Sequence, residues 1–298
     1  MMSYTSRRNL YGKFTQNTST ENLEYGDTLM NEIEKRILNS RAWDFLERVH
    51  TDVTVASQQF YDLPVRYKKL IGRPTITVGS QTYQPLEAPN RSAWDRINST
   101  ESESDTPQYF FIFNGKIGFY PTPATADNTI TLPYEIQAID LSIADYDTGT
   151  ITSIANGGTT VEGSGTSWTA SMVGRYIRID DDNTTTSGDN AWYKIASVTD
   201  SDTLELDVPY EGASITGATQ SYTIAQVSLI PNGYDNLPVY KAAEQYWIDN
   251  EDFSKADRFA RLYNEGIEIM ENERLSKTTS FVVEEDVPIL NPNLYIHK

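Results

Sequence analysis

The sequence predicts an α+β fold: a helical-bundle core of N-terminal and C-terminal helices, a β-rich subdomain, an inserted all-β sandwich or barrel module, and an extended C-terminal tail. Apolar residues follow helical spacing at both ends of the chain, and short β-prone runs separated by Gly, Pro, Asn and Ser lie between them. We expect the core over residues 1–145 and 227–276, the inserted module over 146–226 and the tail over 277–298.

The N-terminal part of the core is expected to hold a helical stretch from about Leu23 to Val49. Its apolar residues recur at intervals of three and four, so they form one buried stripe. Asn39-Ser40 is expected to divide the stretch, with Ser40 capping a second helix that carries Trp43 and Phe45. The chain start has two arginines with no apolar block after them, which argues against a secretory signal.

After His50 the pattern changes to that of a β-rich subdomain. An alternating run ends at Asp62-Leu63-Pro64, and Asn114-Gly115 between two aromatic runs is a strong hairpin signal, since both positions favour positive φ. Pro121 and Pro123 end the second of these strands. Strands are expected over 67–78, 81–86, 109–113, 116–120 and 129–136, with a helical turn and a loop over 91–105.

The stretch of the inserted module is rich in Thr, Ser and Gly, and its strands recur at short intervals, as in all-β sandwiches and barrels. They are expected at 149–154, 159–162, 176–180, 192–198, 203–206 and 221–224. Between Asp145 and Gln226 there are 12 acidic and three basic residues, so this stretch carries −9 of the net charge of −18. A second helical region is expected over 237–276, with a break near Asn250–Asp252 and either Asp252 or Ser254 as the next cap.

The C-terminal tail has no helical period and contains two prolines. It could complete a sheet of its own subunit, but so many apolar residues without a core favour docking on a partner chain, by strand addition or in a groove. The expected contact residues, on the portal protein or a neighbouring subunit, are Phe281, Val282, Val283, Ile289, Leu290, Leu294, Tyr295 and Ile296.

No residue pattern indicates a catalytic, cofactor or metal site. The chain has no cysteine and two histidines, His50 and His297. Asp180-Asp181-Asp182 with Asp189 lacks the alternate spacing and final Glu of a calcium loop, which favours a solvated loop over a cation site. Gly163-Ser164-Gly165 lacks the spacing of a nucleophile elbow. We therefore expect no enzyme and no cofactor.

Charge and hydropathy limit the partners further. A net charge of −18 repels phosphates, so a DNA reader is not expected; the charge suits either solubility or a channel wall along which DNA slides. No run approaches the roughly 18 apolar residues of a membrane helix, so we expect a soluble protein without membrane contact.

The order of these pieces resembles the head-to-tail adaptor, or connector, proteins of tailed bacteriophages, including podovirus tail-tube adaptors. The resemblance covers about residues 20–140 and 228–275, and no single motif is diagnostic. It is carried by Arg41–Leu46 (RAWDFL), Phe60–Pro64 (FYDLP), Tyr83–Leu86 (YQPL), the hairpin Tyr109–Pro123, then Leu229-Ile230-Pro231, Tyr234 and the helix Val239–Trp247 (VYKAAEQYW).

The resemblance implies a structural subunit of the virion neck, assembled in the host cytoplasm. It implies a homo-oligomeric ring, in such families a dodecamer, that sits below the portal protein, extends the DNA channel without sequence-specific binding, and docks tail, nozzle or fibre proteins. It also implies that the C-terminal segment reaches the portal and that the inserted module lies on the ring periphery.

Two other functions remain open from the sequence. A tail-fibre or receptor-binding virion protein would be a trimer with sustained heptads in its helices, and this sequence lacks such heptads. A carbohydrate-active enzyme would place paired carboxylates in an aromatic cleft.

Overall fold

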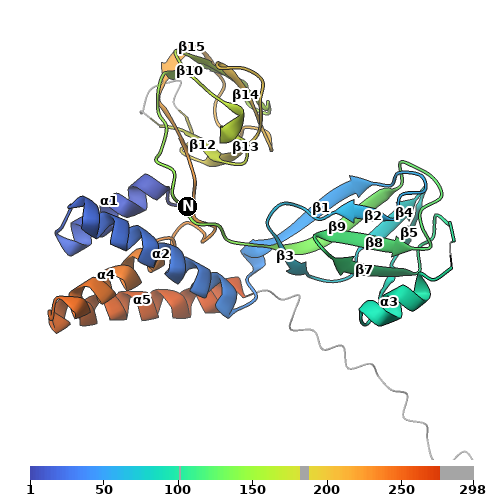
Figure 1. Cartoon of the computed structure of the whole chain (residues 1–298). Helices are drawn as coiled ribbons and strands as arrows, with labels where there is room; N and C mark the ends of the chain where they lie inside the picture. The colour runs from blue at the N-terminus through green and yellow to red at the C-terminus, as the bar shows by residue number, and fades with distance from the viewer. Residues whose placement is uncertain (101, 182–187, 276–298) are drawn as a thin grey trace, which may run out of the picture. The chain divides into compact units, whose positions relative to one another are not determined.

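The computed structural model describes residues 1–100, 102–181 and 188–275, and it confirms the α+β class. The chain forms two compact units. The first comprises residues 1–41 and 138–273 and holds a helical bundle and the inserted β-strands (Figure 1). The second comprises residues 42–137 together with Arg274 and Leu275 at the end of the described chain.

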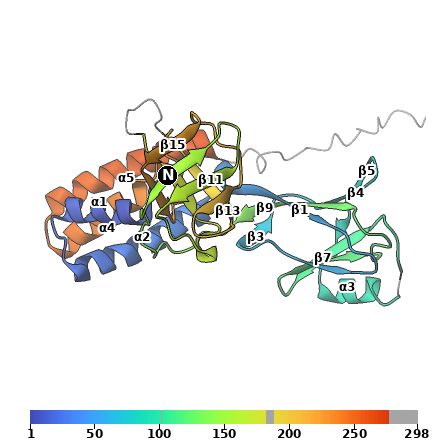
Figure 2. The ribbon, with the colours of Figure 1, turned by 90° about the horizontal axis from the view of Figure 1, so that it is seen from above.

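Four helices form the bundle of the first unit, and they lie side by side in both views (Figures 1 and 2). They are α1 (Tyr4–Thr15), α2 (Thr20–Ser40), α4 (Leu237–Asp249) and α5 (Phe253–Arg274). Aromatic contacts hold them together, since the ring of Phe14 lies 5.7 Å from that of Tyr240 and 5.2 Å from that of Phe259. The expected break between the last two helices is confirmed, and Asp252 caps α5 by accepting the Lys255 N–H.

Helix α1 was not predicted from the sequence. Ser3 caps it by accepting the Ser6 N–H at 3.2 Å. It packs closely on α2 because Gly26 has no side chain: a Cβ at this position would lie 2.2 Å from Cε1 of Tyr11.

The expected second N-terminal helix over Trp43 and Phe45 is wrong. Helix α2 ends at Ser40, and Arg41 is extended, with φ −143° and ψ 167°. The Ser40 hydroxyl bonds back to the Ile37 carbonyl instead of capping a new helix. Trp43 is buried and pairs with Leu275, and a short 3₁₀ turn, η1 (Asp44–Leu46), leads into strand β1.

The second unit is a β-sandwich with one apolar core between two sheets. One sheet has the order β1-β9-β4-β5, with β3 also on β9, and the other has the order β2-β8-β7-β6. The strands are β1 (Glu47–Val53), β2 (Phe60–Asp62), β3 (Tyr67–Leu70), β4 (Thr75–Val78), β5 (Gln81–Tyr83), β6 (Leu86–Glu87), β7 (Tyr109–Phe113), β8 (Lys116–Tyr120) and β9 (Thr129–Ile136).

Local sequence signals set the second sheet of the sandwich. The Asn114-Gly115 hairpin is confirmed, with φ of 51° and 72°. The predicted helical turn is α3 (Arg91–Ile97), whose Trp94 is buried and stacks on Phe111 at 5.9 Å. The aromatic hairpin therefore has its outer face covered by α3.

The inserted strands form one seven-stranded sheet, in the order β15-β10-β11-β14-β13-β12-β16, around its own apolar core. They are β10 (Thr150–Ile154), β11 (Thr160–Ser164), β12 (Tyr176–Ile179), β13 (Trp192–Val198), β14 (Thr203–Leu206), β15 (Ile215–Gln220) and β16 (Tyr222–Ala225), with a 3₁₀ turn, η2 (Ala170–Met172). Strand β15 was not predicted; the other six lie where the sequence placed them, with bounds shifted by two residues at most.

Candidate partner-binding surfaces

A buried polar cluster fixes the helices of the first unit to the chain on both sides of the inserted strands. Nη1 of Arg7 donates to Oε2 of Glu34 at 2.9 Å, and both side chains are almost fully buried. The same carboxylate accepts the Ser228 hydroxyl at 2.8 Å and the Leu229 N–H at 3.2 Å. Burial lowers the pKa of Arg7, and the nearby carboxylates oppose this shift by favouring its charged form.

Asn31 completes the cluster on the other side of the insertion. Its Oδ1 accepts Nη2 of Arg7 at 2.6 Å and the Leu141 N–H at 2.9 Å, and its Nδ2 donates to the Leu141 carbonyl at 3.1 Å. The segment that leads into the module and the segment that leaves it are therefore bonded to the same two helices, α1 and α2.

The two stems of the inserted module also pair with each other. The N–H of Tyr146 donates to the carbonyl of Ile224 at 2.8 Å, and the reverse bond is 2.7 Å. Asp145 joins this point to the chain start, because its carboxylate accepts the Ser3 hydroxyl and the Thr5 N–H. The two segments that flank the inserted strands thus lie at neighbouring backbone positions.

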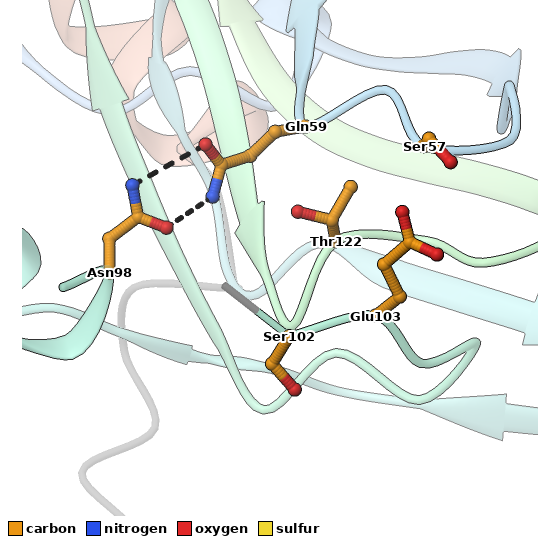
Figure 3. Close-up of a pocket in the computed structure, with 6 residues that line it drawn as sticks. All are labelled: Ser57, Gln59, Asn98, Ser102, Glu103 and Thr122. Atoms are coloured by element: carbon orange, nitrogen blue, oxygen red, sulfur yellow. Dashed lines mark hydrogen bonds between the residues drawn. The ribbon is translucent and has the colours of Figure 1, made fainter. Parts of the chain in front are cut away.

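The second unit contains a polar pocket of about 550 Å³. Figure 3 shows its lining: Ser57, Gln59, Asn98, Ser102, Glu103 and Thr122. Gln59 and Asn98 bond to each other, with Nε2 of Gln59 donating to Oδ1 of Asn98 at 2.5 Å. The lining holds one carboxylate and no aromatic residue, so it lacks the carboxylate pair and aromatic cleft expected of a carbohydrate-active enzyme.

The outer face of the first sandwich sheet carries uncharged, mostly β-branched side chains. On β1 the side chains of Val49 and Val53 are 66% and 46% exposed, and Thr51 between them is also exposed. They lie opposite Pro133, Thr131 and Thr129 of β9. Beyond β9, this face continues through Thr75 and Thr77 of β4. A groove of about 320 Å³ lies beside this face, and its lining combines apolar and charged residues: Glu47, Arg48, Val49, Ile71 and Pro133.

Strand β1 is also an edge strand. It is seven residues long and pairs with β9 along one side, and no other strand of the described chain lies along its other side. Thr54 directs its N–H and C=O to Asn128 and Asp127, on the β9 side. Because neighbouring residues of a strand point their backbone groups to opposite sides, Val53, Thr51 and Val49 face the open edge. We call Val49, Thr51 and Val53 the β1 edge.

The predicted contact residues of the tail (Phe281, Val282, Val283, Ile289, Leu290, Leu294, Tyr295 and Ile296) lie outside the described residues. The other residues weighed as sites take part in local structure. Asp180 accepts Nε of Arg178, and Asp189 accepts the Tyr193 hydroxyl. Asp182 lies outside the described residues. His50 lies on β1 opposite Leu132.

Sequence reasoning missed the buried cluster and the β1 edge. The helical spacing of Tyr4, Arg7, Tyr11 and Thr15 could have indicated a buried face of α1, but two of these four residues are polar. The alternation of Val49, Thr51 and Val53 was present, yet only strand pairing shows that this strand is at an edge.

Within residues 1–100, 102–181 and 188–275, no group of three or more His, Cys, Asp or Glu side chains is arranged to hold a metal ion. None of the described helices has the length and apolar character needed to cross a bilayer.

Comparison with known proteins identifies the family. No curated protein matches the chain. A family model described as SU10 adaptor protein matches residues 7–156, from the buried Arg7 through α2 and the whole sandwich to the end of β10. This match confirms the predicted resemblance to phage head-to-tail adaptors and makes the protein a virion component of a structural class. Because it covers half of the chain, the protein belongs to the SU10 adaptor protein family.

Proposed function

We propose that this protein is a head-to-tail adaptor subunit that forms a ring, a dodecamer, below the portal protein, extends the DNA channel and docks tail proteins. The observation that carries the proposal is the family match, which covers α1 from Arg7 onward, α2 and the entire sandwich. In this role the protein acts by contact, and it catalyses no reaction.

The buried cluster supports a role that depends on fixed geometry. A ring closes only when two different faces of each subunit keep a set angle to each other. Arg7, Asn31 and Glu34 bond α1 and α2 to both stems of the inserted module, so these parts of the first unit are joined by buried, charge-assisted hydrogen bonds.

The charge of the chain supports passage of DNA without adhesion. The net charge is −18, and attraction to DNA increases with each lysine or arginine presented to a phosphate. An acidic ring wall repels the DNA backbone and leaves the genome free to slide.

The tail is proposed to contact a partner chain through its apolar residues Phe281–Val283 and Ile289–Ile296. Deleting residues 277–298 is expected to weaken assembly on the portal while the described units stay folded, because the deletion begins after α5. Co-sedimentation of the variant with purified portal measures attachment, and circular dichroism measures the fold. A matched control replaces Asn291 and Asn293 by Ser and keeps every apolar side chain. Full attachment of the deletion variant would contradict the role of the tail.

A further inference from the structure

The β1 edge is unusually open for a soluble protein. Proteins protect edge strands with lysine, proline, bulges or a covering segment, since a free edge pairs with any available strand. Strand β1 contains neither Lys nor Pro over seven residues, and its register with β9 is unbroken. It does carry three charged residues, Glu47, Arg48 and Asp52, and Oδ1 of Asp52 accepts the Val53 N–H at 2.8 Å.

We propose that residues 281–283 of one subunit add as an antiparallel strand to the β1 edge of a neighbouring subunit. This inference rests on the proposed ring, and it names the surface that receives the tail. Strand addition provides main-chain hydrogen bonds to Thr51 and Val49. The apolar part of the neighbouring groove, formed by Val49, Ile71 and Pro133 beside Glu47 and Arg48, accepts an apolar side chain.

The sequence of the tail fits this edge. The six residues from Thr278 to Val283 are uncharged, and four of them are β-branched. Glu284, Glu285 and Asp286 follow directly. The charges of β1 differ between its two ends: Glu47 and Arg48 of opposite sign lie at the start of the strand, and Asp52 lies near its end.

Avoidance of like charges favours one direction of the added strand. Among the described residues Arg48 has no carboxylate partner, and its Nη1 donates to the carbonyls of Phe45 and Glu47. An antiparallel strand places the three acidic residues beside Glu47 and Arg48, whose charges offset each other, and keeps them away from Asp52. A parallel strand would place them beside Asp52.

The position at which the described chain ends favours a neighbouring subunit as the receiver. Leu275 pairs antiparallel with Trp43, four residues before β1, so the described chain ends near the start of β1. An antiparallel strand on the same subunit would begin opposite Thr51 and run back toward Arg48. The chain would have to pass along the edge within residues 276–280 and then reverse, whereas addition to a neighbour requires no such reversal.

Cysteine cross-linking tests the proposal directly, because the natural chain contains no cysteine. Subunits with Thr51→Cys are mixed with subunits carrying Phe281→Cys, Val282→Cys or Val283→Cys and assembled on purified portal. Mild oxidation should give disulfide-linked dimers with at least one of the three tail positions. Thr82→Cys, an exposed threonine on β5 at the other edge of the same sheet, is the matched control and should give none.

A chain that carries both Thr51→Cys and Val282→Cys shows whether the added strand comes from the same subunit or from a neighbouring subunit. Linked ladders of two or more subunits support addition to a neighbour, and a linked monomer overturns it. Rings that form on the portal without any cross-link also overturn it, while the proposed function stands. Failure to form rings contradicts the proposed function and removes the inference with it.

A second variant removes the backbone donor of the edge. Thr51→Pro has no N–H to offer an added strand, and it leaves the pairing with β9 in place because this N–H faces the open side. We expect about tenfold weaker ring assembly than for Thr51→Val, which keeps the donor. Equal assembly by two folded variants would overturn the proposal.

Discussion

At the scale of single residues, the Arg7–Glu34 pair is the contact on which the first unit depends. Its side chains are 2% and 4% exposed, and Glu34 also accepts bonds from Ser228 and Leu229. A buried ion pair gains little over a well-packed apolar pair, but removing one partner leaves an uncompensated charge in the core.

Replacing Arg7 by Met is therefore expected to lower the free energy of unfolding by about 3–5 kcal/mol. Urea titration followed by circular dichroism measures the loss. The matched control is Arg36→Met, since Arg36 pairs with Glu32 on the surface, with both side chains more than half exposed. The control should change stability by about 0.5 kcal/mol or less. Similar losses in both variants would show that the buried cluster has no special role.

A second residue in the same unit shows how burial affects a carboxylate. Burial raises the pKa of Asp27, and its bonds to Tyr4 and its proximity to Arg8 lower it in part. Because the pKa of Asp27 is raised in the folded state, its contribution favours folding at low pH and is lost as the pH rises through that pKa. Asp27 thus opposes the usual acid sensitivity of paired carboxylates.

At the scale of elements, the contact between α1 and α2 depends on the missing side chain of Gly26. An alanine inside a helix normally gains about 1 kcal/mol over glycine. Here the added Cβ would lie 2.2 Å from the ring of the buried Tyr11, so the helices would have to separate.

Gly26→Ala is expected to destabilise the bundle by about 1–3 kcal/mol despite the better helix propensity. Thermal unfolding followed by circular dichroism measures it. The control Thr28→Ala lies on the exposed side of the same helix and should be neutral or slightly stabilising. A gain in stability for Gly26→Ala would mean that α1 does not pack on α2 at this point.

The helices and strands also show which features of the fold local sequence signals predict and which they do not. Strands β7, β8, β9, β13 and β14 lie at their predicted bounds, because β-branched and aromatic runs bounded by turn residues and proline are local signals. The predicted helix through Trp43 failed because the pattern of RAWDFL is compatible with a helix. What decides its conformation is the pairing of Trp43 with Leu275, more than 200 residues away in the sequence.

The candidate surfaces also differ in whether local sequence or contacts between distant residues define them. The apolar tail could be recognised from the sequence, because apolar residues without a helical period are a local feature. The β1 edge could not, since a free edge is defined by which strands pair, and the partner β9 lies about 80 residues further along the chain. The buried cluster joins residues 7, 31, 34, 141 and 228, a set that no local pattern connects.

At the scale of the whole molecule, the paired stems predict that the inserted strands can be removed. Tyr146 and Ile224 exchange two backbone hydrogen bonds, so their chains are already adjacent. Replacing residues 147–223 by Asn-Gly, a favoured hairpin turn, should leave the helices folded and attached to the portal. Circular dichroism and co-sedimentation check both. Aggregation, or loss of the helical signal, would show that the inserted strands are needed to hold the first unit together.

We propose that the protein functions by assembling on the capsid vertex. Mass photometry of the purified full-length chain, alone and after mixing with purified portal protein, tests it most directly. We expect the portal particle to gain mass in a single step equal to twelve copies of the 33.6 kDa chain. No gain in the mass of the portal particle would contradict the claim.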